Sequence, residues 1–117
     1  MSYALLIKIN SRKVILGGDG TTRVWTDIAD NCAPIIENID VLKAAHHGHL
    51  SGFYEKAAEL MKPKFIIFSN SLGEHRVNGV EREYKSAIPG AEVCKTFEGT
   101  IVVDVPFEQN EEILIYQ

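Results

Sequence analysis

The residues best suited to chemistry in this chain are its histidines and one aspartate set between glycines. Three of the four histidines (His46, His47 and His49) fall within four consecutive positions, and Asp19 lies in the segment Gly17-Gly18-Asp19-Gly20. Imidazole and carboxylate groups together suit zinc, manganese or iron. The sequence therefore predicts a metal site in which Asp19 joins one or both of His46 and His47.

Each of these residues has a simpler explanation when it is taken alone. Asp19 flanked by glycines is typical of a turn, and an isolated histidine pair often has no function. His75, the fourth histidine, stands in a polar stretch and by itself indicates a surface residue of a loop. The metal hypothesis depends on where the surrounding elements place these residues.

Apolar patterns divide the chain into alternating strands and helices. A helix that begins at Thr21 or Thr22 and a helix from Ser51 to Met61 are expected, and a capping box of Asn78 and Glu81 begins a third. We expect 70–76 to be a polar loop, and Glu98-Gly99 to be a hairpin turn. The predicted strands are 3–9, 13–16, 39–45, 64–69, 91–95, 100–105 and 111–116, of which the first two form a hairpin.

Polar and metal-capable residues follow the ends of three predicted strands. Asp19 comes after the second strand, His46 and His47 come directly after the third, and Asn70 follows the fourth. In open α/β sheets the carboxyl ends of the strands meet at one edge, where binding sites form. The order of the elements therefore predicts an α/β fold in which the aspartate and the histidines lie close together.

This order of motifs resembles the second half of the metallo-β-lactamase superfamily. The segment GGDG after an apolar strand, followed by IDVLKAAHHGHLS, is similar to the hydrolase domains of bacterial DNA-uptake (competence) proteins and their free-standing relatives. The likeness continues through KPKFIIFSNS, the loop GEHR and the closing segment EGTIVVDV, and it covers about residues 3–105. The most specific part of the pattern is Asp-Val-Leu-Lys-x-x-His-His-Gly.

The resemblance implies an α/β fold that is half of a metallo-β-lactamase-like αββα sandwich. A mixed sheet would carry about three helices on one face, and residues 1–117 would form a single, truncated domain. Because the other half of the sandwich would supply the second sheet, one face of this sheet would be uncovered. Large exposed apolar patches usually mark interfaces. We therefore expect a homodimer, or a partner chain that covers the open face.

The resemblance also implies roles for individual residues. Asp19 matches a carboxylate that bridges two metals, and one of His46 and His47 matches the last metal ligand. We favour His47 as the ligand, with His46 facing the substrate, although the sequence does not order the two. His75 matches a histidine that faces the substrate. His46 and His75 would then be catalytic residues that donate hydrogen bonds to developing negative charge.

The chain departs from the family pattern in ways that bear on activity. His49 stands where the family has serine, and Arg76 stands where it has proline. The family's earlier His-x-His-x-Asp-His motif, which supplies most ligands of the first metal, is absent, since no histidine precedes His46. A catalytic zinc usually has three protein ligands and a water. One copy of the chain therefore supplies at most an incomplete site for zinc or manganese.

The motifs that are present and the metal ligands that are missing lead to two possible functions of different classes. The first is a metal-dependent hydrolase fragment or subunit, directed at phosphodiesters by its likeness to the DNA-uptake branch, in which metals activate water and polarise the bond under attack. The second is a non-catalytic homodimeric module that keeps the fold without the hydrolase activity. A third alternative is an unrelated small α/β domain whose histidines bind nothing.

Composition and net charge narrow the classes of protein to which the chain can belong. The 117 residues are 45% hydrophobic and 24% charged, which is ordinary for a globular domain. No apolar run could span a membrane, and the first residues carry no secretion signal, so a cytoplasmic location is expected. The net charge of −4 disfavours a nucleic-acid surface, although a metal would supply local positive charge. Cys32 and Cys94 are expected to be buried, reduced thiols.

Overall fold

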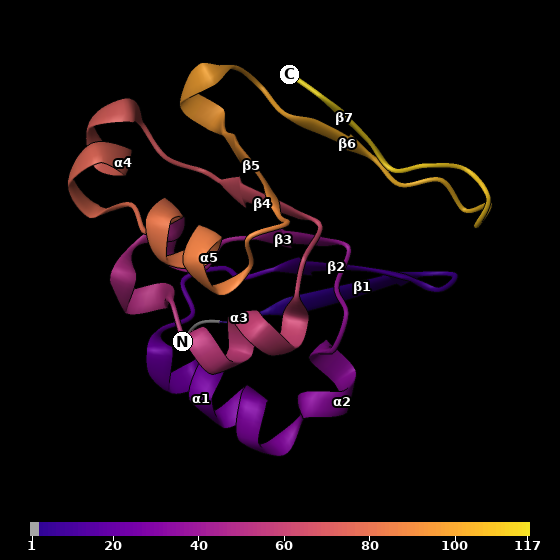
Figure 1. The fold of residues 1–117 in the computed structure, drawn as a ribbon, viewed down its shortest axis with the longest axis horizontal. Helices are drawn as coiled ribbons and strands as arrows, with labels where there is room; N and C mark the ends of the chain where they lie inside the picture. Colours follow the sequence, from indigo (N-terminus) through magenta and orange to yellow (C-terminus); the bar gives the residue numbers. More distant parts are fainter. Residues whose placement is uncertain (1–2) are drawn as a thin grey trace.

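The structure consists of a five-stranded mixed sheet, a layer of helices and a separate two-stranded sheet (Figure 1). The computed structural model describes residues 3–117. The strands are β1 (Leu5–Ile9), β2 (Arg12–Leu16), β3 (Val41–Lys43), β4 (Phe65–Phe68), β5 (Glu92–Lys95), β6 (Val102–Asp104) and β7 (Leu114–Tyr116). The helices are α1 (Thr22–Asn31), α2 (Ala33–Ile36), α3 (Glu55–Met61), α4 (Leu72–Asn78) and α5 (Glu81–Ala87). Three short 3₁₀ turns are η1 (Ala45–Gly48), η2 (Leu50–Gly52) and η3 (Thr96–Glu98). The predicted α/β fold with a mixed sheet is confirmed.

The strands of the main sheet lie in the order β1-β2-β3-β4-β5. β1 and β2 pair antiparallel across a tight turn, which confirms the predicted hairpin. The three remaining pairings, β2 with β3, β3 with β4 and β4 with β5, are all parallel. Because parallel strands end at the same edge of a sheet, the segments after β2, β3, β4 and β5 meet at one place.

The core lies between the main sheet and the helices. Ile15, Leu42 and Ile66 are register partners on neighbouring strands, and all three are buried. They point to the helical side, because side chains alternate between the two faces along a strand. The helices supply the opposing apolar residues, which include Trp25, Ala29, Ala57, Ala58, Met61 and Tyr84.

Two helices, α3 and α5, each pack an apolar face on the sheet. In α3 the buried residues are Ala57, Ala58 and Met61, and the helix ends where Lys62 takes a left-handed conformation before Pro63. α5 buries Tyr84, and the flanking Val80 and Ile88 are buried as well. Helical spacing of apolar residues therefore identified the faces that pack on the sheet.

The segment predicted to be a polar loop contains a helix instead. α4 occupies 72–78, and the hydroxyl of Ser71 caps it by accepting a hydrogen bond from the backbone N–H of Glu74 at 3.2 Å. The pattern Ser-x-x-Glu is a capping signal. The predicted capping box of Asn78 and Glu81 is wrong, because Asn78 ends α4 and α5 begins after Val80 without a side-chain cap.

The predicted hairpin turn at Glu98-Gly99 is also wrong. β5 adds to the main sheet parallel to β4, and β6 pairs with β7 rather than with β5. The 3₁₀ turn η3 separates β5 from β6. The Gln117 side chain donates hydrogen bonds to the carbonyl oxygens of Lys95 and Gly99, which ties the end of the chain to this turn.

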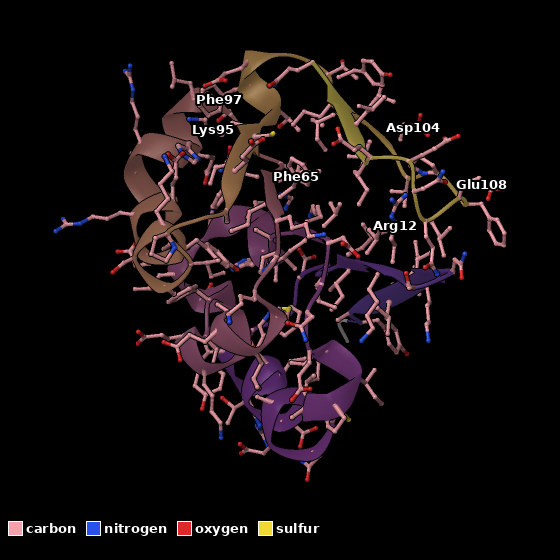
Figure 2. The ribbon with its side chains drawn as sticks, turned by 45° about the vertical axis from the view of Figure 1, so that its right-hand side comes forward. Arg12, Phe65, Lys95, Phe97, Asp104 and Glu108 are labelled. Carbon is pink, nitrogen blue, oxygen red and sulfur yellow. The ribbon has the colours of Figure 1, made fainter. Side chains whose placement is uncertain are left out.

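The face of the sheet away from the helices is partly covered by the β6–β7 hairpin. Arg12 on β2 donates hydrogen bonds to the carbonyl oxygens of Pro106 and Glu111 in the connection between β6 and β7. Figure 2 shows Arg12 reaching toward this connection, with Phe65 on the same side of the sheet. Leu5 on β1, at 55% exposed, remains open on this face. The uncovered sheet face expected from the sequence is therefore only partly present in one chain.

Two further expectations concern location and the thiols. Within residues 3–117 no helix combines the length and the apolar character that crossing a bilayer requires. Cys32 and Cys94 are half-buried rather than fully buried, and neither is in a disulfide.

Candidate functional site

The loops after β2 and β3 touch at the carboxyl edge of the sheet. The backbone N–H of Gly17 donates to the carbonyl oxygen of Lys43 at 3.0 Å, and the N–H of His46 donates to the carbonyl of Gly18 at 2.8 Å. A Cβ at Gly17 would lie 2.8 Å from the backbone of Ala45. Glycine at this position therefore lets the loop that carries Asp19 approach the histidine turn closely.

The histidine turn η1 is held in an unusual backbone conformation. His46 has φ 50° and His47 has φ 54°, which places two successive non-glycine residues in the left-handed region. Such residues cost roughly 1–3 kcal/mol each and persist only where the surroundings hold them. Buried Ala44 and Ala45 come before the two histidines, and after them the carbonyl of Gly48 accepts a hydrogen bond from the N–H of Val80 at 2.9 Å. The fold thus fixes where the two rings point.

His47 is the histidine that faces Asp19. Its Nε2 atom lies 3.8 Å from Oδ1 of Asp19. Its Nδ1–H donates a hydrogen bond to the carbonyl oxygen of Ser69 at 3.0 Å. Because a carbonyl oxygen only accepts, this bond places the proton of the neutral ring on Nδ1 and leaves the lone pair on Nε2. The His47 side chain is 54% exposed and that of Asp19 is 68% exposed, so an ion from solvent can reach both.

The other two histidines of the run have different partners. His46 Nδ1 shares a hydrogen bond with the hydroxyl of Ser51. His49 Nε2 pairs with a carboxylate oxygen of Glu74 at 2.7 Å. The rings of His46 and His47 are 6.5 Å apart between centroids. The structure therefore brings His47, and not His46, to the carboxylate of Asp19.

Asn70 connects the histidine turn to the segment that carries His75. Its side-chain amide donates to the carbonyl oxygen of His47 at 3.0 Å and to Nδ1 of His75 at 3.1 Å. Its backbone N–H donates to the hydroxyl of Thr96 after β5 at 3.0 Å. Among the described residues, its buried Oδ1 atom has no hydrogen-bond partner. Loops after three strands are thus joined through one asparagine.

His75 is mostly enclosed and has both ring nitrogens engaged. Its side chain is 12% exposed. Since Nδ1 accepts from Asn70, the neutral ring carries its proton on Nε2 and donates it to Glu81 at 2.8 Å. A hydrogen bond from His75 to a substrate, as expected from the sequence, would have to replace the bond to Glu81.

Glu81 is the centre of a charge cluster beside His75. Its carboxylate contacts Lys85 at 2.8 Å and Lys95 at 3.2 Å as well as His75. Burial alone would raise the pKa of Glu81, but hydrogen bonds from Lys85, His75 and Lys95 outweigh it and lower the pKa to about 2. The pKa of Lys95 is raised, because its bonds to Glu81 and Glu98 outweigh the opposite effect of burial. The carboxylate is therefore ionised at all ordinary pH values.

As a metal site the arrangement is partial. Two ligands of one zinc ion, each bound at about 2 Å, lie about 3–4 Å apart, so the 3.8 Å between Asp19 and His47 fits a shared ion. In the part of the chain that the structure describes, no group of three or more His, Cys, Asp or Glu side chains is placed to hold a metal. One copy supplies a carboxylate oxygen and an imidazole nitrogen, and further ligands would have to come from water or another chain.

Several residues that shape this region were not predicted from the sequence. Ser69 orients His47 through a backbone carbonyl, which no side-chain motif reveals. Glu74 and Glu81 hold His49 and His75, yet Glu81 was expected only as part of a helix cap. A signal was available for Glu74, since Ser71 three residues earlier makes the capping pattern. The cluster around Glu81 depends on contacts between residues distant in sequence.

No protein-family model matches the chain, and no curated protein matches it either.

Proposed function

We propose that this chain is a metal-dependent hydrolase subunit that binds one divalent cation, zinc or manganese, through Asp19 and His47. The observation that carries the proposal is the orientation of His47. The Ser69 carbonyl holds the His47 proton on Nδ1, so that the Nε2 lone pair is available 3.8 Å from the carboxylate. Metal-binding histidines typically donate their other nitrogen to such a carbonyl or to a carboxylate.

The chemistry of the subunit would be divided between the cation and the chain. When bound, a divalent cation supplies Lewis-acid activation of water and of the bond under attack, which by resemblance to the DNA-uptake branch is a phosphodiester. Asp19 and His47 hold the cation. The Asn70 side chain donates a hydrogen bond to the His47 carbonyl, which holds the loop after β4 against the loop after β3. The Ser51 hydroxyl holds the His46 ring through Nδ1. The other ring nitrogen of His46 can donate a hydrogen bond to substrate.

Zinc titration tests the proposal. We expect the chain to bind zinc, and the Asp19→Ala and His47→Ala variants to bind it at least about tenfold more weakly, because each removes one of two protein ligands. Isothermal titration calorimetry, with competition by a coloured chelator, measures the affinity. Hydrolysis of a simple phosphodiester in the presence of manganese then tests activity directly.

His49→Gln is the matched control for this titration. His49 belongs to the same histidine run, but its Nε2 faces Glu74, and glutamine can keep that contact. Zinc affinity should be unchanged in this variant. If zinc does not bind at micromolar concentrations, or binds equally well to the Asp19→Ala and His47→Ala variants, the proposal is wrong and the non-catalytic module is favoured.

A specific observation also supports a homodimer, which the alternative function requires. Leu5, Ile7 and Leu16 lie on the sheet face opposite the helices and are 55%, 38% and 39% exposed. The outward face of the β6–β7 hairpin exposes further large apolar side chains, which are Val102, Leu114 and Tyr116. A second copy of the chain can bury both surfaces at once, because an interface between two identical copies can pair each surface with the other.

The homodimer is tested by mass in solution. At micromolar concentration, light scattering should give twice the chain mass of 13.0 kDa. Ile7→Lys with Leu16→Lys should shift the protein to monomer, because two charges cannot be buried in an apolar interface without a partner. Leu72→Lys, at an exposed leucine on α4, should leave the mass unchanged. A wild-type monomer at this concentration would contradict the proposal.

The proposal also includes a location. Two unpaired, half-buried thiols are typical of proteins in a reducing compartment. We therefore propose that the subunit acts in the cytoplasm.

A further inference from the structure

A groove with an excess of positive charge lies beside His75, outside the Asp19–His47 pair. It is an open depression of about 660 Å³. Four basic side chains line it, against two carboxylates. The cations are Arg76, Arg82, Lys85 and Lys95, and the carboxylates are Glu81 and Glu98. The whole chain has a net charge of −4 with only 12 Lys and Arg residues, so this local excess of two positive charges runs against the overall balance.

The four cations divide into two that are paired and two that are available. Lys85 and Lys95 both contact Glu81, and Lys95 also contacts Glu98 at 3.4 Å. Arg76 and Arg82 are exposed, and neither has an ion pair with any side chain that the structure describes. Guanidinium groups present several N–H donors in a planar fork that matches phosphate oxygens. The groove therefore has two guanidinium groups without ion pairs that can bind an oxyanion.

The walls of the groove are partly apolar. Leu72 and Phe97 are both among the residues that line it. Figure 2 shows Lys95 and Phe97 next to each other, and the Lys95 ammonium lies 5.9 Å from the centre of the Phe97 ring. Glu81 also lines the groove, and its carboxylate contacts both Lys85 and Lys95. A ligand with an anionic group and an apolar ring would fit this lining, because the basic side chains can bind the anion and the apolar side chains can pack against the ring.

We propose that this groove binds the terminal phosphate of a small phosphate monoester, of the nucleoside monophosphate class, through Arg76 and Arg82. A terminal phosphate carries close to two negative charges and three exposed oxygens, whereas a phosphodiester within a strand carries one charge. Two separate guanidinium groups suit the former. The ring of the ligand would rest against Leu72 and Phe97. Binding at this groove does not depend on metal binding by Asp19 and His47.

The neighbouring carboxylates set a limit on the role of Arg82. Arg82 also borders a second depression that includes Glu55 and Glu83. Arg76 borders the first groove and does not border this second depression. We therefore expect Arg76 to contribute at least as much as Arg82 to binding.

Calorimetric titration of the full chain in excess chelator tests the proposal independently of any metal site. The probes are adenosine monophosphate, adenosine, and a short single-stranded oligonucleotide that lacks terminal phosphates. The monophosphate should bind and the other two should bind much more weakly or not at all. Arg76→Gln and Arg82→Gln should each weaken the binding of the monophosphate by up to about tenfold, because each removes charge-assisted hydrogen bonds.

A charge-matched double variant separates a built site from general attraction. The groove variant combines Arg76→Gln with Arg82→Gln. Its control, Arg23→Gln with Lys8→Gln, removes the same number of positive charges at exposed positions on α1 and β1. Binding that is lost in the groove variant and kept in this control supports the proposal. Equal loss in both, no heat of binding at millimolar monophosphate, or binding of the oligonucleotide alone would each overturn it.

Discussion

Replacing Gly48 with alanine is expected to destabilise the protein by about 2–5 kcal/mol. A Cβ at this position would lie 2.0 Å from Cδ1 of Phe68, and Gly48 has φ +77°. The left-handed conformation alone costs a residue with a Cβ about 1–2 kcal/mol. Phe68 is fully buried and packs edge-on against His75 and Tyr84, so its ring cannot move aside without further cost. Urea unfolding of both proteins measures the difference as a shift in midpoint.

Gly73→Ala is the control for this substitution. Gly73 lies in α4, and a Cβ there would meet nothing within 4 Å. Since alanine is favoured over glycine in a helix by roughly 0.5–1 kcal/mol, this variant should be as stable as the wild type or slightly more so. If Gly48→Ala unfolds at the same urea concentration as the wild type, the close contact between the histidine turn and Phe68 does not exist in solution.

The close contact of Gly48 with Phe68 gives the histidine motif a structural role in the fold. In His46-His47-Gly48 the glycine lets the turn rest on the aromatic core, and the two histidines before it take the same left-handed conformation. The sequence also predicted that residues after β2, β3 and β4 would meet, because strand periodicity and the alternation of strands with helices are local signals. The proximity of Asp19 to His47 followed from these signals.

Other features could not be read from the sequence, for identifiable reasons. That His47 rather than His46 faces Asp19 depends on the backbone carbonyl of Ser69, which follows a strand distant in sequence. The β6–β7 hairpin was misassigned because a Gly-containing turn after β5 looks the same whether the next strand returns to β5 or crosses to another layer. Local patterns give the elements, and tertiary contacts decide their partners.

The site and the groove share one structural support. His75 is bonded to Asn70, which also bonds the His47 carbonyl, and on its other side His75 donates to Glu81. Glu81 in turn holds Lys85 and Lys95. The proposed metal pair and the proposed phosphate groove are therefore connected through a continuous set of hydrogen bonds that ends at one carboxylate. Loss of that carboxylate is therefore expected to lower stability.

Replacing Glu81 with glutamine is expected to reduce stability at neutral pH by about 2–3 kcal/mol. The pKa of Glu81 is lowered from 4.5 to about 2 in the folded protein, since its bonds to Lys85, His75 and Lys95 outweigh the effect of burial. A carboxyl group whose folded pKa is lowered stabilises the fold at pH values above its unfolded pKa. This contribution is lost as the pH falls from about 5 to about 2. Glutamine has no such contribution at any pH.

The difference between wild type and variant, rather than either curve alone, isolates Glu81 from the other carboxylates. Unfolding free energies of both proteins should differ most at pH 6–7 and nearly converge as the pH falls to about 2, where the folded wild-type carboxyl is itself partly protonated. Glu83→Gln, the same change at an exposed position of α5, should alter stability by less than about 0.5 kcal/mol across this range. A difference between wild type and Glu81→Gln that stays constant from pH 7 to pH 3 would mean that the carboxylate does not hold the lysines and His75 together. In that case Glu81 would not fix the positions of Lys85 and Lys95 beside the groove.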